Sequence, residues 1–278
     1  MHDPFLIQGP AMISFSGGRI SAYMLYRIVQ AHGGKLPDDI VVAFANTGKE
    51  REETLHFVYE CGSRWGVSIR WLEWRDTDPC YELVGFNSAS RNGEPFAALI
   101  RKKQRLPNWQ ERWCTSFLKL LPMFALAKSF AWVAGEYAEV IGIRDDEGMR
   151  ILNGLARAER DGRKVIYPLA KAKIRKADVM DFWRGQPFDL GLEPWEGNCD
   201  LCMATGRGVR LARIRRNPGC AKWWHEMEVE RGGFFDRRDR VIELVQAAAR
   251  QVDMFEDASF DEFDAECGDG CGFGEAAE

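Results

Sequence analysis

The sequence lacks the two features that would direct it to a membrane or out of the cell. No run of apolar residues approaches the length needed to span a bilayer. The segment from Met1 to Pro10 does not place an apolar stretch after a basic one, as a secretory signal does. We therefore expect a cytoplasmic protein with no membrane partner.

Positive charge is missing from the end of the chain. Residues 251–278 contain ten of the 42 acidic residues and no Lys or Arg. All 38 basic residues lie before that segment, so the body of the protein is basic although the formal net charge is −4. A basic body is compatible with anionic partners such as nucleotides or nucleic acid, whereas the acidic end could equally be a solvated tail.

Internal repeats are also absent, and strand-like apolar runs alternate with helical patterns. This alternation predicts an α/β fold with a doubly wound parallel sheet. The expected strands are 11–15, 40–45, 68–74, 138–143 and 164–168, and the expected helices are 21–31, 50–65, 96–104, 115–130 and 176–183. After Pro194 the pattern changes to loop and to short helices around 207–216, 220–230 and 238–251.

The change in pattern predicts three parts. A nucleotide-binding α/β domain is expected over residues 1–190, a mostly helical, cysteine-bearing segment over 191–250, and an acidic tail over 251–278.

The most informative local motif follows the first apolar run. It reads Ser16-Gly17-Gly18-Arg19-Ile20-Ser21, which predicts a buried strand, a tight glycine turn and the start of a helix. Glycines let backbone N–H groups approach an anion closely, and the first amides of a helix are free to bind one. We expect this segment to hold phosphate, with Ser16, Gly17, Gly18, Arg19 and Ser21 as nucleotide-binding residues. An ordinary strand-to-helix turn is the alternative.

A polar turn follows the second expected strand. It contains Asn46, Thr47 and Gly48 and leads into a helix with acidic residues in its first turn. Because ligands of such sheets bind at the carboxyl ends of the strands, we expect this turn to lie beside the glycine loop and to bind the same nucleotide. Alone, it would be an ordinary connection.

A charged segment follows the fourth expected strand, beginning at Gly142. Arg144 and Arg150 could grip phosphate or sulfate oxygens through two parallel hydrogen bonds, with Glu147 orienting one of them. We expect Gly142 and both arginines in the nucleotide site, and Arg144 and Glu147 in catalysis. A surface charge cluster is the alternative.

The eight cysteines do not indicate a disulfide framework in a chain without a secretory signal. Cys61 and Cys80 have no partner spacing and are expected to be small buried apolar residues. A C-x-x-C pair in the loop after Pro194 is typical of a metal, cluster or redox site. Two further cysteines could complete a four-thiolate site for a 4Fe–4S cluster or, alternatively, for zinc. The expected metal ligands are Cys114, Cys199, Cys202 and Cys220.

These motifs together resemble a known family. The segment from Arg112 to Pro122 resembles the C-x-x-x-R/K-x-x-P element of adenylylsulfate (APS) and phosphoadenylylsulfate (PAPS) reductases, and the C-x-x-C follows about 85 residues later, as in cluster-bearing members. The glycine loop resembles the pyrophosphate-binding (PP) loop of the wider ATP pyrophosphatase and adenine nucleotide α-hydrolase superfamily. The segments at 46–54, 142–150 and 167–179 resemble further elements of that superfamily, in its order.

The resemblance implies an adenine nucleotide α-hydrolase-like sheet that binds PAPS, APS or ATP at the glycine loop, with or without a Mg²⁺ ion. Ile20 stands where the pyrophosphatases usually have an aspartate. Cluster-bearing reductases have two adjacent cysteines where this chain has Trp113-Cys114, so Cys220 is the candidate for the remaining ligand. Alternatively, three cysteines leave one iron open, as in tRNA 2-thiocytidine synthetases.

Three roles remain open under this resemblance. A PAPS or APS reductase would use Cys267 (with Cys271 as the alternative) to attack the sulfonate sulfur, and a thiol or electron-donor protein would supply electrons. An ATP-dependent sulfurtransferase would adenylate a nucleic acid and then displace AMP with sulfur. The arginine-rich stretch 207–216, near Trp223 and Trp224, would then bind the nucleic acid or would be a solvated helix face. The third role is that of a non-catalytic module that binds a nucleotide or a nucleic acid and contains a structural metal.

Overall fold

The computed structural model describes residues 3–250 of the 278-residue chain. Its centre is a six-stranded sheet in the order β4-β3-β2-β1-β5-β6. Each neighbouring pair is parallel except β3 and β4, which are antiparallel. The strands are β1 (Ala11–Ser14), β2 (Ile40–Asn46), β3 (Ile69–Trp74), β4 (Tyr81–Val84), β5 (Ala138–Ile141) and β6 (Lys164–Ile166).

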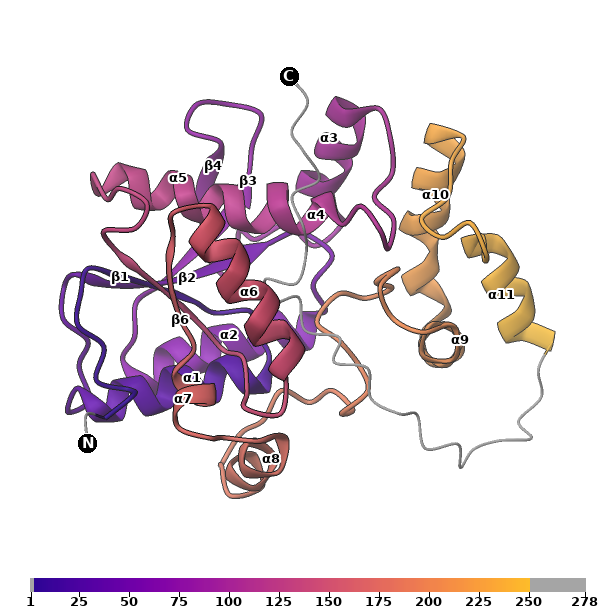
Figure 1. The fold of residues 1–278 in the computed structure, drawn as a ribbon. Helices are drawn as coiled ribbons and strands as arrows, with labels where there is room; N and C mark the ends of the chain where they lie inside the picture. Colours follow the sequence, from indigo (N-terminus) through magenta and orange to yellow (C-terminus); the bar gives the residue numbers. More distant parts are fainter. Residues whose placement is uncertain (1–2, 251–278) are drawn as a thin grey trace.

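Helices cover both faces of the sheet, which confirms the expected doubly wound α/β fold (Figure 1). One face is covered by α1 (Arg19–Ala31), α2 (Glu52–Trp65) and α8 (Lys176–Arg184), and the other by the π-helical turn η1 (Ser116–Leu120) and α5 (Leu121–Ser129). Alternate residues of β1 serve the two faces: Ile13 packs in the first core and Met12 in the second. Two covered faces explain why the central strands β1 and β2 are almost entirely apolar.

The helical remainder of the described chain gathers beside the sheet, next to α3 (Glu94–Lys103), as Figure 1 shows. It consists of α9 (Arg207–Arg216), the 3-10 turn η2 (Pro218–Ala221), α10 (Lys222–Arg231) and α11 (Val241–Arg250). These elements share one apolar cluster with α3 and with α4 (Trp113–Thr115), centred on the fully buried Trp224. We call this cluster the cysteine-side core. Within residues 3–250, no helix is both long and apolar enough to cross a membrane.

Three elements are not anticipated by the sequence patterns. Strand β4 is short and partly exposed at the sheet edge, so it carries no continuous apolar run. Helix α6 (Gly148–Arg160) has an apolar stripe, but Met149 and Leu152 on it are 70% and 62% exposed. The third element is the single turn α7 (Pro168–Lys171), and the helix expected over 115–130 is interrupted by η1.

Candidate functional site

The glycine loop joins β1 to α1 and has the geometry expected of an anion site. Gly17 has a φ of +81°, and a Cβ there would lie 2.7 Å from Cγ2 of Thr54. The Ser21 hydroxyl donates to the carbonyl of Gly18 (3.0 Å) and accepts from the backbone N–H of Ser16 (3.2 Å). The loop is therefore closed by its own serines at the positive end of a 13-residue helix.

Arg19 is directed away from this loop. Its guanidinium binds both carboxylate oxygens of Asp189, at 2.7 and 2.6 Å, and donates to the carbonyl of Leu192 at 2.8 Å. The Trp183 indole donates to the carbonyl of Arg19 at 2.9 Å. These contacts tie the start of α1 to the chain after α8, so they favour a positioning role for Arg19 over the expected contact with nucleotide.

The turn after β2 is closed by Glu50. The backbone N–H and the hydroxyl of Thr47 donate to Oε2 of Glu50, at 2.7 and 2.8 Å, and Lys119 on η1 pairs with Oε1 at 3.2 Å. Gly48, with a φ of +78°, donates to Oδ1 of Asn46 at 3.1 Å. The turn is thus preformed, and its polar groups are held at the carboxyl end of β2.

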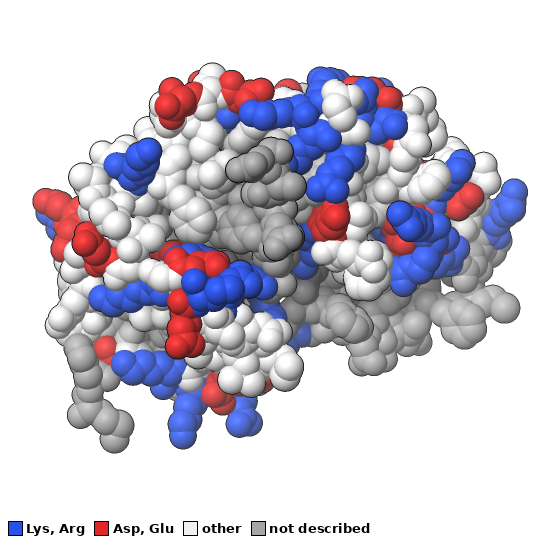
Figure 2. Space-filling view, turned by 45° about the horizontal axis from the view of Figure 1, so that its top comes forward, with Lys and Arg blue, Asp and Glu red and all other residues white. Residues whose placement is uncertain are grey.

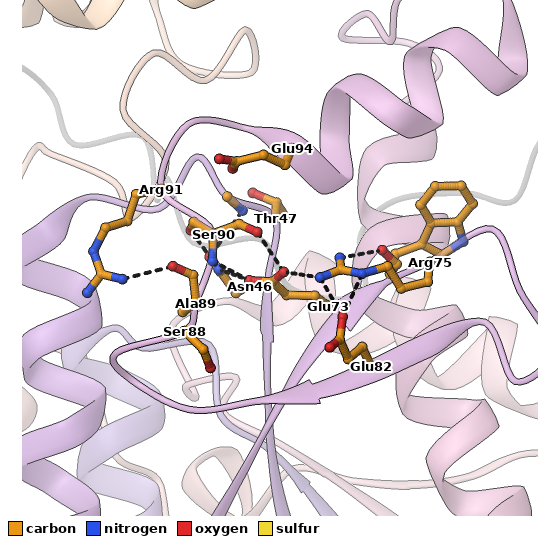
Figure 3. A network of polar contacts seen from close by, with 12 residues as sticks. Asn46, Thr47, Glu73, Arg75, Glu82, Ser88, Ala89, Ser90, Arg91 and Glu94 are labelled. Carbon is orange, nitrogen blue, oxygen red and sulfur yellow. Dashed lines mark hydrogen bonds and ion pairs between the residues drawn. The ribbon is translucent and has the colours of Figure 1, made fainter.

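Asn46 is held in a buried polar network at the ends of β2 and β3 (Figure 3). Its amide donates to Oε1 of Glu73 at 2.7 Å and to the carbonyl of Ser90 at 2.9 Å. Ser90 donates to Glu73 through its N–H and its hydroxyl, at 2.6 and 2.7 Å, and Arg75 pairs with the same carboxylate at 2.9 Å. Because both contacts use the amide nitrogen of Asn46, this side chain orders the turn, and its N–H groups are not directed at a ligand. No sequence motif contains Glu73 or Ser90, so both were missed.

The segment after β5 is brought to the glycine loop by Gly142. A Cβ at this position would lie 3.2 Å from Cα of Ser21, so the close approach favours glycine. Arg144 is only 3% exposed, and its Nε lies 2.9 Å from Oδ1 of Asp146. Its backbone N–H donates to Glu147 at 2.9 Å, and Arg150 also pairs with Glu147. The expected catalytic and binding residues of this segment therefore form one cluster.

Asp146 is the carboxylate that neutralises Arg144 in this cluster. Burial acts to raise its pKa, but the hydrogen bonds from Arg144 and from the backbone N–H of Lys176 hold that pKa below its ordinary value. The carboxylate is therefore ionised at neutral pH and keeps the guanidinium in place.

The C-x-x-C segment packs directly on the turn after β2. The N–H of Arg51 donates to the carbonyl of Asn198 at 2.8 Å, and the N–H of Asp200 donates to the carbonyl of Lys49 at 3.0 Å, on either side of a β-bridge between Glu50 and Cys199. Asn198 also donates its amide to the carbonyl of Ser16 in the glycine loop, at 2.9 Å. The thiol segment and the glycine loop thus form one site.

The side chain of Asp200 fastens the thiol segment to both neighbouring regions. Lys49 pairs with its Oδ2 at 2.7 Å, and the Trp224 indole donates to its Oδ1 at 2.7 Å. Burial raises the pKa of Asp200 despite the nearby Lys49 ammonium. The residue joins the turn after β2 to the centre of the cysteine-side core.

The four expected metal ligands, Cys114, Cys199, Cys202 and Cys220, all pack against the cysteine-side core. Within residues 3–250, however, no three His, Cys, Asp or Glu side chains are grouped so that they could hold a metal ion. The assignment of these four thiols to a cluster or zinc site therefore stays a prediction. Cys267 and Cys271 lie outside the described residues.

The remaining cysteines of the described chain differ in burial. Cys61 on α2 is fully buried, and burial raises the pKa of its thiol, as expected for a small core residue. Cys80 is half-buried, and burial also raises its pKa. Burial raises the pKa of Cys220 to about 11; the neighbouring Asp200 adds to this shift and Arg213 opposes it.

The spacing between Cys114 and Lys119 is one residue longer than in the element that it resembles. The structure accommodates the extra residue in η1, because a π-helical turn holds one residue more than an α-helical turn. Lys119 thereby pairs with Glu50 in the turn after β2.

The arginines of α9 do not form a single exposed face. Arg210 and Arg213 are 4% and 2% exposed, and Arg210 pairs with the buried Asp236 at 2.8 Å. Arg207 pairs with Asp239 and Arg216 with Glu196. Figure 2 shows Lys and Arg on the face that it draws in several groups, with Asp and Glu among them. Two of the five arginines of this stretch therefore lie in the interior and not on a solvated helix face.

The fold and the site define the class: an α/β protein in which a glycine loop and a C-x-x-C segment meet at the carboxyl edge of a mostly parallel sheet. No family model matches the sequence. An uncharacterized nin region protein of Escherichia phage lambda is 30% identical over 202 residues, which is 69% of this chain and 65% of that protein.

An uncharacterized protein of Methanocaldococcus jannaschii is 32% identical over 117 residues, which is 42% of this chain and 19% of that protein. The chain thus spans less than two thirds of either curated relative. Among solved structures, the U34-tRNA thiolase NcsA from Methanococcus maripaludis with its 4Fe–4S cluster matches with a TM-score of 0.37 and 15% identity, over 86% of this chain and 70% of that chain. A similarity of that degree assigns no activity.

Proposed function

We propose that this chain is an ATP-dependent sulfurtransferase that adenylates a nucleic-acid acceptor and replaces an oxygen of that acceptor with sulfur. The observation that carries the proposal is the direct attachment of the C-x-x-C segment to the glycine loop and to the turn after β2. A phosphate site and a pair of thiols in contact are what adenylation followed by sulfur transfer requires.

The first step uses the glycine loop. Its amides and the N-terminus of α1 would hold the phosphates of ATP, while an acceptor oxygen attacks the α-phosphorus and pyrophosphate leaves. In the second step a sulfur nucleophile attacks the adenylated carbon, and AMP leaves with the former acceptor oxygen. A persulfide on Cys199 or Cys202, formed from thiosulfate with release of sulfite, would supply this sulfur through its outer atom. The other thiol of the pair would then attack the inner sulfur and break the S–S bond, which frees the thiolated acceptor and leaves a Cys199–Cys202 disulfide for an external thiol to reduce.

Sulfur transfer is favoured over nucleotide reduction by the position of the thiols. Cys199 is fixed in a β-bridge to Glu50, in the turn after β2. The neighbouring Asn198 donates a hydrogen bond to the glycine loop, so the C-x-x-C segment lies beside the loop that would hold the nucleotide.

A nucleic-acid acceptor is supported by the end of α3 and the loop after it. Lys102, Lys103 and Arg105 lie close together, and burial together with the positive charges of the other two lowers the pKa of Lys103. Trp109 follows in the same loop and is 55% exposed. Clustered cations beside an exposed indole suit a phosphate backbone with unstacked bases.

The test is an assay with ATP labelled in its α-phosphate, a bulk transfer-RNA fraction, thiosulfate and a thiol reductant. We expect labelled AMP that depends on the RNA, and sulfur incorporation that is lost in Cys199→Ser but kept in Cys80→Ser, the matched control outside the thiol segment. Sulfite release from PAPS or APS, without any RNA-dependent AMP from ATP, would replace this proposal with the reductase.

A further inference from the structure

A pocket of about 400 Å³ opens behind the thiol segment. It lies between the start of α2, the chain before the C-x-x-C and the turn η2, and no residue of the glycine loop lines it. Its walls include Arg51, Arg91, Arg213, Arg216, Glu196 and Cys220. The volume lies in the range of small-molecule sites.

The carboxylates of this pocket already have cationic partners. Arg51 and Arg216 both pair with Glu196, which is almost fully buried. Lys49 pairs with Asp200, Lys119 with Glu50 and Arg91 with Glu52. The carboxylates of the wall are therefore neutralised within the protein and do not require a bound cation.

Arg213 is different. Only 2% of it is exposed, and its guanidinium donates a hydrogen bond from Nη1 to the carbonyl of Cys199, at 3.4 Å. Its Nε and Nη2 have no hydrogen-bond partner among the described residues. A buried guanidinium whose N–H groups lack hydrogen-bond partners is costly. An anion that enters the pocket would remove this cost.

A thiol lies on the same wall. Cys220 follows Arg213 in the chain, in η2, and both residues line the pocket. A guanidinium with unsatisfied N–H groups binds oxyanions through paired hydrogen bonds. A neighbouring thiol distinguishes this pocket from a site for plain sulfate or phosphate.

We propose that the pocket binds an oxyanion that carries a transferable sulfur, of which thiosulfate is the simplest, with the oxyanion on Arg213 and the sulfur toward Cys220. The identity of the ligand as a sulfur donor rests on the proposed sulfurtransferase function. The Cys220 thiolate would attack the outer sulfur of thiosulfate, which forms a persulfide on Cys220 and releases sulfite. A thiol of the C-x-x-C segment would then take the outer sulfur from this persulfide and leave Cys220 as a thiolate.

The test is calorimetric binding of thiosulfate, sulfate and phosphate to the full-length protein and to two variants. Arg213→Met keeps the approximate length of the side chain and removes its charge; Arg215→Met makes the same change at an exposed position on the same helix. We expect wild type and Arg215→Met to bind thiosulfate alike and Arg213→Met to bind it roughly tenfold or more weakly, the value of a charge-assisted hydrogen bond.

Equal binding by Arg213→Met would overturn the proposal, and so would a preference for phosphate or sulfate over thiosulfate. If Arg213→Met does not fold, Arg213→Lys keeps the charge without the paired N–H groups and should bind thiosulfate more weakly than wild type does. ATP binding is measured on the same samples. Absence of ATP binding by wild type would refute the proposed function, whereas the thiosulfate result depends only on the pocket.

Discussion

The part of the molecule around the sheet and the part around the cysteine-side core place their functional residues by different means. We call them the sheet side and the helical side. On the sheet side, the glycine loop and the turn after β2 are each closed by contacts within a few residues, such as Ser21 to Gly18 and Thr47 to Glu50. On the helical side, Asp200, Arg213 and Trp224 are brought together from separate elements. A local motif can therefore describe the first kind of site, but not the second.

The largest expected effect falls on the network that holds the turn after β2. Glu73→Ala removes a fully buried carboxylate that accepts hydrogen bonds from Asn46, Ser90 and Arg75. We expect a loss of about 4 kcal/mol in the free energy of unfolding, measured by urea denaturation. Glu82→Ala is the control, because this carboxylate shares Arg75 but is 57% exposed, and its loss should cost about 1 kcal/mol or less. Equal losses of unfolding free energy in Glu73→Ala and Glu82→Ala would mean that the hydrogen bonds to Glu73 do not act together.

The next effect concerns the glycine loop. Gly17→Ala places a Cβ 2.7 Å from Thr54 on a backbone with a φ of +81°, so strain and overpacking should together cost roughly 3 kcal/mol. Gly33→Ala is the matched control, since its φ is +69° but nothing lies within 4 Å. We expect ATP binding, followed by fluorescence of a nucleotide analogue, to be lost in Gly17→Ala alone. ATP binding that survives in Gly17→Ala would argue against a phosphate site in this loop.

A smaller effect tests the helical side through pH. Burial opposes ionisation of Asp236, but hydrogen bonds from Arg238 and Arg210 lower its pKa from 3.8 to about 2. A pKa lowered by folding contributes stability that is present above the unfolded value and is lost as the pH falls toward the folded one. We expect Asp236→Asn to cost roughly 2 kcal/mol at pH 7 and progressively less between pH 4 and pH 2. A cost independent of pH in acid denaturation would contradict this assignment.

The smallest effect tests the junction between the two sides. Asn198→Ala removes the hydrogen bond to Ser16 and should cost about 1 kcal/mol, while weakening sulfur incorporation more than release of pyrophosphate. Asn153→Ala, at an exposed position of α6, is the control and should change neither. Parallel losses of both partial reactions in Asn198→Ala would show that the two steps are not spatially separate.

Much of the fold could be predicted because the parallel strands are apolar and separated by amphipathic helices. The expected strand at 40–45 matches β2 within one residue, and the helix expected at 207–216 matches α9. Strand β4 and helix α6 could not be found in this way. An exposed edge strand has no apolar run, and the stripe of α6 faces outward at Met149 and Leu152.

The candidate site was predictable where its residues lie in one segment. Gly17 and Gly142 could be recognised from the turns that they open, and the C-x-x-C from its spacing. Glu73 and Arg213 could not, because their roles depend on burial and on partners from distant elements. The four cysteines expected to bind a metal pack against one apolar cluster, and their binding of a metal stays a prediction.

The hydrogen bond from Asn198 to Ser16 has a consequence for how this protein folds. It joins residues 182 positions apart, so the loop that it closes includes nearly the whole sheet. Contacts between residues so far apart in the sequence depend on prior folding of the chain between them. We therefore expect the glycine loop, which its own serines close, to form before residues 198–202 dock on it.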